Sequence, residues 1–126
     1  MKQVMKMKKI IIVEDDERLR EELKILLENN GYEARILRTF DHAADALIEM
    51  DADLVLLDIM IPGINGQQVL KQLRAKSDVP VIMVTSKNNE VDEVLSMSYG
   101  ADDYITKPYN QTLLHLHIEA LFKRMN

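Results

Sequence analysis

Short apolar runs alternate with helix-like stripes along the chain, and this alternation restricts the fold more than any other feature. We expect strands at residues 10–13, 32–37, 54–57, 79–85 and 104–107. Apolar residues three or four positions apart follow each run and predict helices. These stripes are Leu19, Leu23, Leu26 and Leu27; Phe40, Ala44 and Leu47; Val69, Leu70 and Leu73; Val91, Val94 and Leu95; and Leu114, Ile118 and Leu121. Five strands alternating with five helices predict an α/β domain with a single doubly wound parallel sheet.

Individual residues signal where the predicted helices begin and end. Asn29-Asn30-Gly31 predicts the end of the first helix, and Gly100 predicts the end of the fourth. Thr39 or Asp41 is expected to cap the second helix, because a side-chain oxygen there can accept a hydrogen bond from a free amide of the first turn. Pro62-Gly63 and Asn65-Gly66 predict a loop before the third helix.

The composition fits one small domain. The chain has 126 residues, of which 47% are hydrophobic and 29% are charged, as is ordinary for a globular protein. Its net charge of -5 argues against binding nucleic acid without a partner domain, because such binding needs a basic face. The absence of cysteine removes disulfides and thiolate sites, and it agrees with a reducing, cytoplasmic location.

The sequence predicts neither a membrane span nor an export signal. The longest apolar run, residues 79–84, is far shorter than the ~18 residues that a span needs. The apolar segment at residues 10–13 is too short for the core of a signal peptide. We interpret residues 1–7 as a tail, residues 8–124 as the domain, and residues 125–126 as the start of a linker or the C-terminus.

Charged residues stand where the predicted strands end. Asp58 follows the run at residues 54–57, Glu14 and Asp15 follow the run at residues 10–13, and Lys107 closes the last strand. A buried carboxylate without compensation costs several kcal/mol, so acids are poor choices for the end of a buried strand unless they have a role. In doubly wound sheets these ends form the ligand site. Three acids and a lysine there suggest a site for a divalent cation and a phosphoryl group.

Four motifs in order resemble the receiver domain of two-component response regulators, over nearly the whole chain. They are Ile12-Val13-Glu14-Asp15-Asp16, Leu56-Leu57-Asp58-Ile59-Met60-Ile61-Pro62-Gly63, Val81-Ile82-Met83-Val84-Thr85-Ser86 and Tyr104-Ile105-Thr106-Lys107-Pro108. The segment from Gly100 to Tyr109 is further similar to the OmpR/PhoB subfamily, whose members join a receiver to a DNA-binding winged helix. The resemblance implies a flavodoxin-like, CheY-like fold with strand order 2-1-3-4-5 and a cis Lys107-Pro108 bond.

The same resemblance implies a role for each site residue. Asp58 would accept a phosphoryl group from a sensor histidine kinase, and Lys107 and Thr85 would contact the transferred oxygens. The metal would be Mg²⁺ or Mn²⁺, bound by Glu14, Asp15, Asp58 and the backbone carbonyl of Met60. After phosphorylation, Thr85 and Tyr104 would move together and report the event at the surface. The protein would then be a signalling switch rather than an enzyme acting on other substrates.

The resemblance also indicates an output face made by the fourth helix, the fifth strand and the fifth helix. OmpR/PhoB receivers commonly pair there through opposite charges, and the matching positions in this chain are Glu93 with Leu113 and Asp103 with His117. The first pair lacks complementary charges, and the second needs a protonated His117, which mildly acidic pH favours. We therefore expect a weak, phosphorylation-dependent homodimer that tightens as pH falls. Any DNA binding would belong to a separate effector domain.

Each of these residues has an ordinary structural alternative when it is taken alone. A lone acid at a strand end is usually solvated or caps a helix, which is the role expected of Asp16. Thr85 and Tyr104 alone would be common strand residues. His42, His115 and His117 show no metal-ligand spacing, and the eight methionines are interpreted as packing residues.

Other functions that use this fold fit less well. A phosphatase of the haloacid dehalogenase type would carry a second aspartate where this chain has Met60. The four glycines form neither a P-loop nor a dinucleotide fingerprint. A flavodoxin-like cofactor binder would not explain Lys107. A stand-alone receiver and a phosphorylation-independent pseudo-receiver remain open alternatives, although the intact site argues against the second. We expect the chain to be a receiver excised from a longer regulator.

Overall fold

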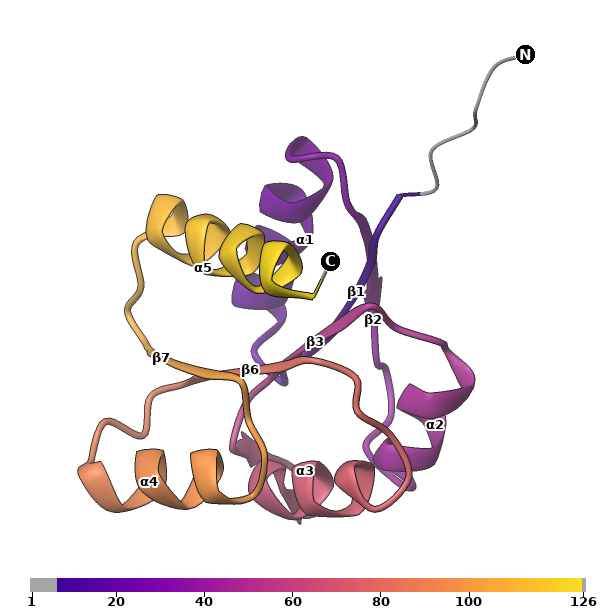
Figure 1. Ribbon diagram of the computed structural model, residues 1–126, viewed down its shortest axis with the longest axis vertical. Helices are drawn as coiled ribbons and strands as arrows, with labels where there is room; N and C mark the ends of the chain where they lie inside the picture. The colour runs from indigo at the N-terminus through magenta and orange to yellow at the C-terminus, as the bar shows by residue number, and fades with distance from the viewer. Residues whose placement is uncertain (1–6, 126) are drawn as a thin grey trace.

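A five-stranded parallel sheet forms the centre of the computed structural model, which describes residues 7–125 (Figure 1). Its strands lie in the order β2-β1-β3-β6-β7. They are β1 (Lys9–Val13), β2 (Glu33–Ile36), β3 (Leu54–Leu57), β6 (Val81–Thr85) and β7 (Asp103–Thr106). The helices are α1 (Glu17–Asn29), α2 (Ala43–Glu49), α3 (Gly66–Arg74), α4 (Glu90–Ser98) and α5 (Gln111–Arg124).

This arrangement confirms the predicted order 2-1-3-4-5, counted along the main sheet. The labels differ because the segment predicted as a plain loop contains two short strands, β4 (Met60–Ile61) and β5 (Ile64–Asn65). They pair antiparallel with each other, outside the main sheet. Strands of two residues carry too little periodicity to be predicted from a pattern. The loop prediction was therefore incomplete rather than misplaced.

The helices cover both faces of the sheet, α1 and α5 on one side and α2, α3 and α4 on the other (Figure 1). Alternate residues of each central strand point to opposite faces, so one strand supplies both cores. In β1, Ile11 and Val13 pack against α2 and α3, whereas Ile10 and Ile12 pack against α1 and α5. Burial on both faces explains why the strands read as continuous apolar runs.

Asparagine and aspartate caps fix where four of the helices begin. Asp16 accepts a hydrogen bond from the Leu19 amide, which confirms its predicted role at the start of α1. Asn65, Asn89 and Asn110 cap α3, α4 and α5 in the same way. The expectation that Thr39 or Asp41 caps the second helix was wrong. The helix starts later, after His42 in the left-handed region (φ 53°), and His42 makes no side-chain capping bond.

Helix α4 forms where its apolar stripe predicts a helix, but the two valines of that stripe do not face the core. Val91 and Val94 are 74% and 60% exposed, and the buried residue of this helix is Ser96. Within residues 7–125, α4 contributes no side chain to either apolar core cluster. In the same part of the chain, no helix is long and apolar enough to cross a membrane.

Candidate phosphoryl-acceptor site

Two buried carboxylates lie side by side where β1 and β3 end. Val13 pairs with Leu57 in the parallel register, and the Asp58 amide donates to the Val13 carbonyl at 3.0 Å. The next side chains, Glu14 and Asp58, are only 3% and 4% exposed. The order of the sheet reverses between β1 and β3, so the acids occupy the point where doubly wound sheets place their ligands.

Lys107 reaches both acids from the end of β7. Its Nζ lies 2.6 Å from Glu14 Oε1 and 2.8 Å from Asp58 Oδ2. The Lys107 amide donates to the Thr85 carbonyl at 2.8 Å, and the Lys107-Pro108 bond is cis, as expected. The structure therefore brings Glu14, Asp58 and Lys107 together as the sequence predicted.

One lysine only partly compensates two buried carboxylates. Burial raises the pKa of Glu14, and the charge of Asp58 adds to this, whereas the hydrogen bonds from Lys107 and from the Asp16 amide act in the opposite direction. For Lys107, burial lowers the pKa, but the bonds to Asp58 and Glu14 outweigh it and the net shift is upward. The ammonium group is held charged, and the site keeps an excess of negative charge that favours cations.

Asp15 takes a different position from the two buried acids. It is exposed and lines a cavity of about 590 Å³ together with Met60, Asn65 and Lys87. Across residues 7–125, no three acidic or histidine side chains already form a metal-binding cluster. Among the residues that line this cavity, Asp15 and Asn65 carry side-chain oxygens, and Met60 bonds through its amide to Asp58. Oxygen donors of this kind fit Mg²⁺, which usually binds one or two carboxylates and keeps several waters.

Thr85 and Tyr104 meet at the loop that follows β6. Thr85 is fully buried, and its hydroxyl accepts a hydrogen bond from the Lys87 amide at 3.3 Å. The Tyr104 hydroxyl donates to the Lys87 carbonyl at 2.6 Å. Burial, with the charges of Asp92, Glu93 and Asp58, raises the pKa of Tyr104 to about 12, so this hydroxyl stays protonated. The two predicted switch residues thus both bond to the backbone of Lys87, Thr85 at its amide and Tyr104 at its carbonyl.

Two residues of the site were missed by sequence reasoning. Gly66 lies so close to the backbone after β3 that a Cβ there would be 2.0 Å from the Asp58 carbonyl oxygen, and its amide donates to the Ile59 carbonyl at 2.7 Å. Lys87 links Thr85 to Tyr104 through its backbone. Asn65-Gly66 was interpreted only as a turn signal, and no side-chain pattern marks a residue that acts through its backbone.

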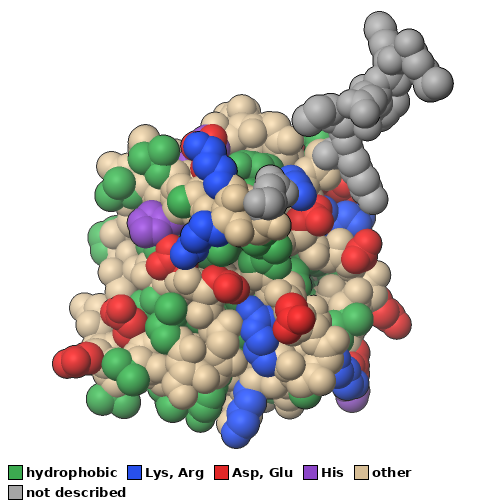
Figure 2. Space-filling view, viewed as in Figure 1, with side chains coloured by type: hydrophobic (Ala, Val, Ile, Leu, Met, Phe, Trp, Pro, Cys, Tyr) green, Lys and Arg blue, Asp and Glu red, His purple; other side chains and the backbone are tan. Residues whose placement is uncertain are grey.

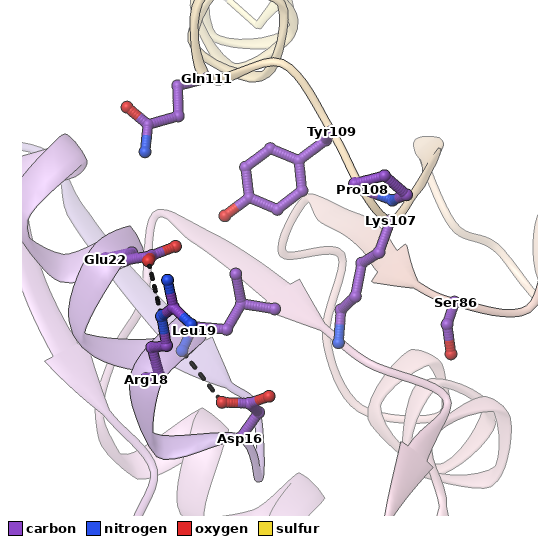
Figure 3. Close-up of a pocket in the computed structure, with 9 residues that line it drawn as sticks. All are labelled: Asp16, Arg18, Leu19, Glu22, Ser86, Lys107, Pro108, Tyr109 and Gln111. Carbon is purple, nitrogen blue, oxygen red and sulfur yellow. Dashed lines mark hydrogen bonds and ion pairs between the residues drawn. The ribbon is translucent and has the colours of Figure 1, made fainter.

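A pocket of about 490 Å³ opens beside Lys107 (Figure 3). Figure 3 shows the Lys107 side chain along one wall and Arg18, Leu19 and Glu22 of α1 along the opposite wall. Tyr109 lies above the lysine, and burial raises its pKa beyond the physiological range, so its hydroxyl stays neutral. The α1 wall of this pocket carries one positive and one negative side chain, because Arg18 and Glu22 form an exposed ion pair at 3.4 Å.

The predicted output face is only partly paired within the chain. His117 Nδ1 lies 2.6 Å from Asp103 Oδ2, so these two residues already contact each other across β7 and α5. Glu93 is exposed on α4, and Leu113 on α5 is 56% exposed. The structure thus places all four residues near the expected face, with the acid and the histidine as an internal pair.

The sheet order, the two buried acids and the lysine define an α/β domain of the CheY-like type. The sequence profile of the response regulator receiver domain matches residues 10–119, and the chain belongs to this family. It is 46% identical to the sensory transduction protein RegX3 of Mycobacterium tuberculosis over 118 residues, which cover 94% of this chain and 52% of that protein. The chain thus spans about half the length of the curated relatives it matches.

Solved structures agree with this assignment. The BeF₃-activated receiver domain of Klebsiella pneumoniae RstA superposes with a TM-score of 0.85 at 30% identity, covering 90% of this chain and 97% of that one. A two-component response regulator from Clostridium difficile gives a TM-score of 0.89 at 27% identity, with 94% and 98% covered. The expected doubly wound fold is confirmed.

Proposed function

We propose that this receiver domain accepts a phosphoryl group on Asp58 from a sensor histidine kinase and so controls an output. The observation that carries the proposal is the contact of Lys107 with both Glu14 and Asp58, at 2.6 and 2.8 Å. A structural ion pair would need one acid for one lysine. A second buried acid is costly in a resting protein, but it is useful if a cation and a phosphoryl group complete the site.

The chemistry assigns a task to each side chain. The Asp58 carboxylate attacks the phosphorus of a phosphohistidine, the P–N bond breaks, and the histidine leaves with the shared electron pair. One Asp58 oxygen accepts from the Met60 amide at 3.1 Å and the other faces Lys107, so the carboxylate is held in a fixed orientation. Lys107 remains charged and balances the negative charge on the transferred oxygens. Thr85 would donate its hydroxyl to the product.

The oxygen donors of the site fit Mg²⁺ or Mn²⁺. Asp15, Asp58, Glu14 and the Met60 carbonyl would hold the ion, with Glu14 binding directly or through water. The bound ion supplies positive charge for the transferred phosphoryl oxygens. Because the two buried acids share one lysine, the protein's own charge distribution supports cation binding beside Asp15.

The output is proposed to be transcriptional. The likeness to OmpR/PhoB regulators, and the match to only half of RegX3, support a receiver at residues 8–124 that acts with a separate DNA-binding domain. Its location would be cytoplasmic, where kinase and DNA are both accessible. A stand-alone receiver, or a pseudo-receiver that acts without phosphorylation, is the alternative.

Phosphorylation by a small donor separates these functions. We expect acetyl phosphate with Mg²⁺ to shift the wild-type band on a phosphate-affinity gel. Asp58→Asn should remove the shift, and EDTA should suppress it in the wild type. Asp53→Asn is the matched control, because Asp53 lies before β3 and bonds the Lys9 amide at 2.7 Å, away from the site. An unshifted wild type would favour the pseudo-receiver, and a shift that survives in Asp58→Asn would contradict the assigned acceptor.

A further inference from the structure

Helix α4 is attached to the domain through polar contacts rather than through an apolar face. Its buried residue is Ser96, which is fully buried, and none of its apolar residues joins the core clusters of the described chain. Of its apolar side chains, Val91, Val94 and Met97 are 74%, 60% and 42% exposed, and Leu95 is half-buried. Figure 2 shows hydrophobic side chains gathered at the lower left, where Figure 1 places α4.

The polar attachment comes from Gln67 on α3. Its side chain is 6% exposed, and its Nε2 lies 3.1 Å from Ser96 Oγ, 3.2 Å from the Asp92 carbonyl and 3.3 Å from Asp92 Oδ1. Asp92 Oδ2 in turn accepts a hydrogen bond from the side-chain amide of Asn89, and the Asp92 backbone amide donates to Asn89 Oδ1, which caps α4. A buried amide keeps such bonds because leaving it unpaired would cost desolvation free energy.

Gln67 is also tied to the phosphoacceptor. It follows Gly66, whose backbone is packed against the Asp58 carbonyl and bonded to Ile59. Its own amide donates to Asn65 at 2.7 Å. A continuous set of contacts therefore runs from the backbone at Asp58 through the first turn of α3 and the Gln67 side chain to Asp92 and Ser96.

We propose that Gln67 is a positioning residue that latches α4 in its unphosphorylated position, and that phosphorylation of Asp58 acts on α4 through this latch. The inference rests on the proposed phosphoacceptor function. The latch holds an arrangement in which apolar side chains face water, so a competing arrangement that covers more of them is favoured once the bonds are lost. A bond that favours the resting arrangement must, by reciprocity, oppose binding of a phosphoryl analogue at Asp58.

Two variants remove the latch and two exposed neighbours serve as controls. Gln67→Leu keeps the side-chain size but removes the amide, and Ser96→Ala removes one hydroxyl with little change in volume. The matched controls are Gln68→Leu on α3 and Ser98→Ala on α4, both at exposed positions. If Gln67→Leu fails to fold, Ser96→Ala still tests the proposal.

The first readout is amide hydrogen exchange in the untreated protein. We expect exchange in α4 to be roughly three- to tenfold faster in Gln67→Leu, as the loss of one or two hydrogen bonds implies, and somewhat less accelerated in Ser96→Ala. Exchange in β1 and β3 should stay unchanged, which excludes a global loss of stability. The two controls should match the wild type. Unchanged or slower exchange in α4 would overturn the latch.

The second readout is titration with beryllium fluoride in the presence of Mg²⁺, followed by exchange at α4. We expect half-saturation at a severalfold lower concentration in Gln67→Leu than in the wild type. Faster exchange with an unchanged titration would show that Gln67 is merely structural and would overturn its positioning role. If the wild type shows no saturation with beryllium fluoride, the phosphoacceptor function itself is overturned. If the wild type saturates normally and the variants do not differ from it, only the latch is overturned.

Discussion

At the scale of single residues, the site is an arrangement of three charges in which the two acids outnumber the lysine. Glu14 and Asp58 are both nearly buried and both contact Lys107. Removing one acid leaves a neutral pair, whereas removing the lysine leaves two like charges facing each other. These two changes should therefore have opposite effects on stability.

We expect Asp58→Asn to raise the free energy of unfolding by about 1 kcal/mol without Mg²⁺, and Lys107→Met to lower it by about 3 kcal/mol. Denaturant titration at neutral pH measures both values. The double variant should recover part of the Lys107→Met loss, because it no longer holds two like charges. If both single variants are destabilised equally, the site is not under charge repulsion.

The raised pKa of Glu14 predicts a pH dependence with a definite sign. The Glu14 carboxyl binds its proton more tightly in the folded protein than in the unfolded chain. Its stabilising contribution is therefore complete below the ordinary pKa of 4.5, and it is lost as the pH rises through the raised pKa of the folded state. Relative to the wild type, Glu14→Gln should gain stability over that window.

Thermal scans from pH 4 upward test this expectation, with the exposed Glu21→Gln as control. Saturating Mg²⁺ should reduce the advantage of Glu14→Gln, because a bound cation favours the ionised carboxylate. An advantage of Glu14→Gln that falls with rising pH would show that the sign is wrong.

At the scale of elements, the sequence predicts the alternation of strands and helices because buried runs and amphipathic stripes have different periods. It does not show which way a stripe faces. The stripes in α3 and α5 are buried, but Val91 and Val94 of α4 face water. The β4–β5 hairpin and the start of α2 after His42 depend on tertiary packing, which a local pattern cannot contain.

This difference between helices predicts unequal costs of truncation. Leu70 of α3 is fully buried, and Leu70→Ala should lower the free energy of unfolding by roughly 2–5 kcal/mol through lost burial and a cavity. Val94 is 60% exposed, and Val94→Ala should change it by less than about 0.5 kcal/mol. Denaturant titration of both variants provides the comparison. A large loss in Val94→Ala would mean that α4 packs on the core.

At the scale of the whole molecule, the candidate site was predictable because it lies at strand ends, whose convergence follows from the sheet order. Two features of the site could not be predicted from the sequence. They are the contact of Lys107 with both Glu14 and Asp58 and the link of Thr85 to Tyr104 through Lys87. Both depend on side-chain orientation and backbone contacts. The output face lies between these cases. Its four positions lie on α4, β7 and α5, and Asp103 and His117 pair within one chain.

Association through this face stays a prediction. The chain has a net charge of -5, and lower pH makes this charge less negative, which reduces repulsion between two copies. Sedimentation of the beryllium fluoride-treated protein should show a weak dimer that is tighter at pH 6 than at pH 8. Leu113→Glu should weaken it, because Leu113 is 56% exposed and adds apolar area. A tight dimer that is insensitive to pH would contradict this account.

The most direct test of the account is to locate the phosphoryl group on the chain. Borohydride reduces an acyl phosphate to an alcohol but leaves a free carboxylate intact, so it converts a phosphorylated aspartate to homoserine. After treatment with acetyl phosphate and Mg²⁺, followed by borohydride, peptide mass spectrometry should find homoserine at position 58 and unchanged Glu14 and Asp15. Reduction at Glu14 or Asp15 instead, or unmodified Asp58 after exhaustive treatment, would contradict the central claim that Asp58 is the phosphoacceptor.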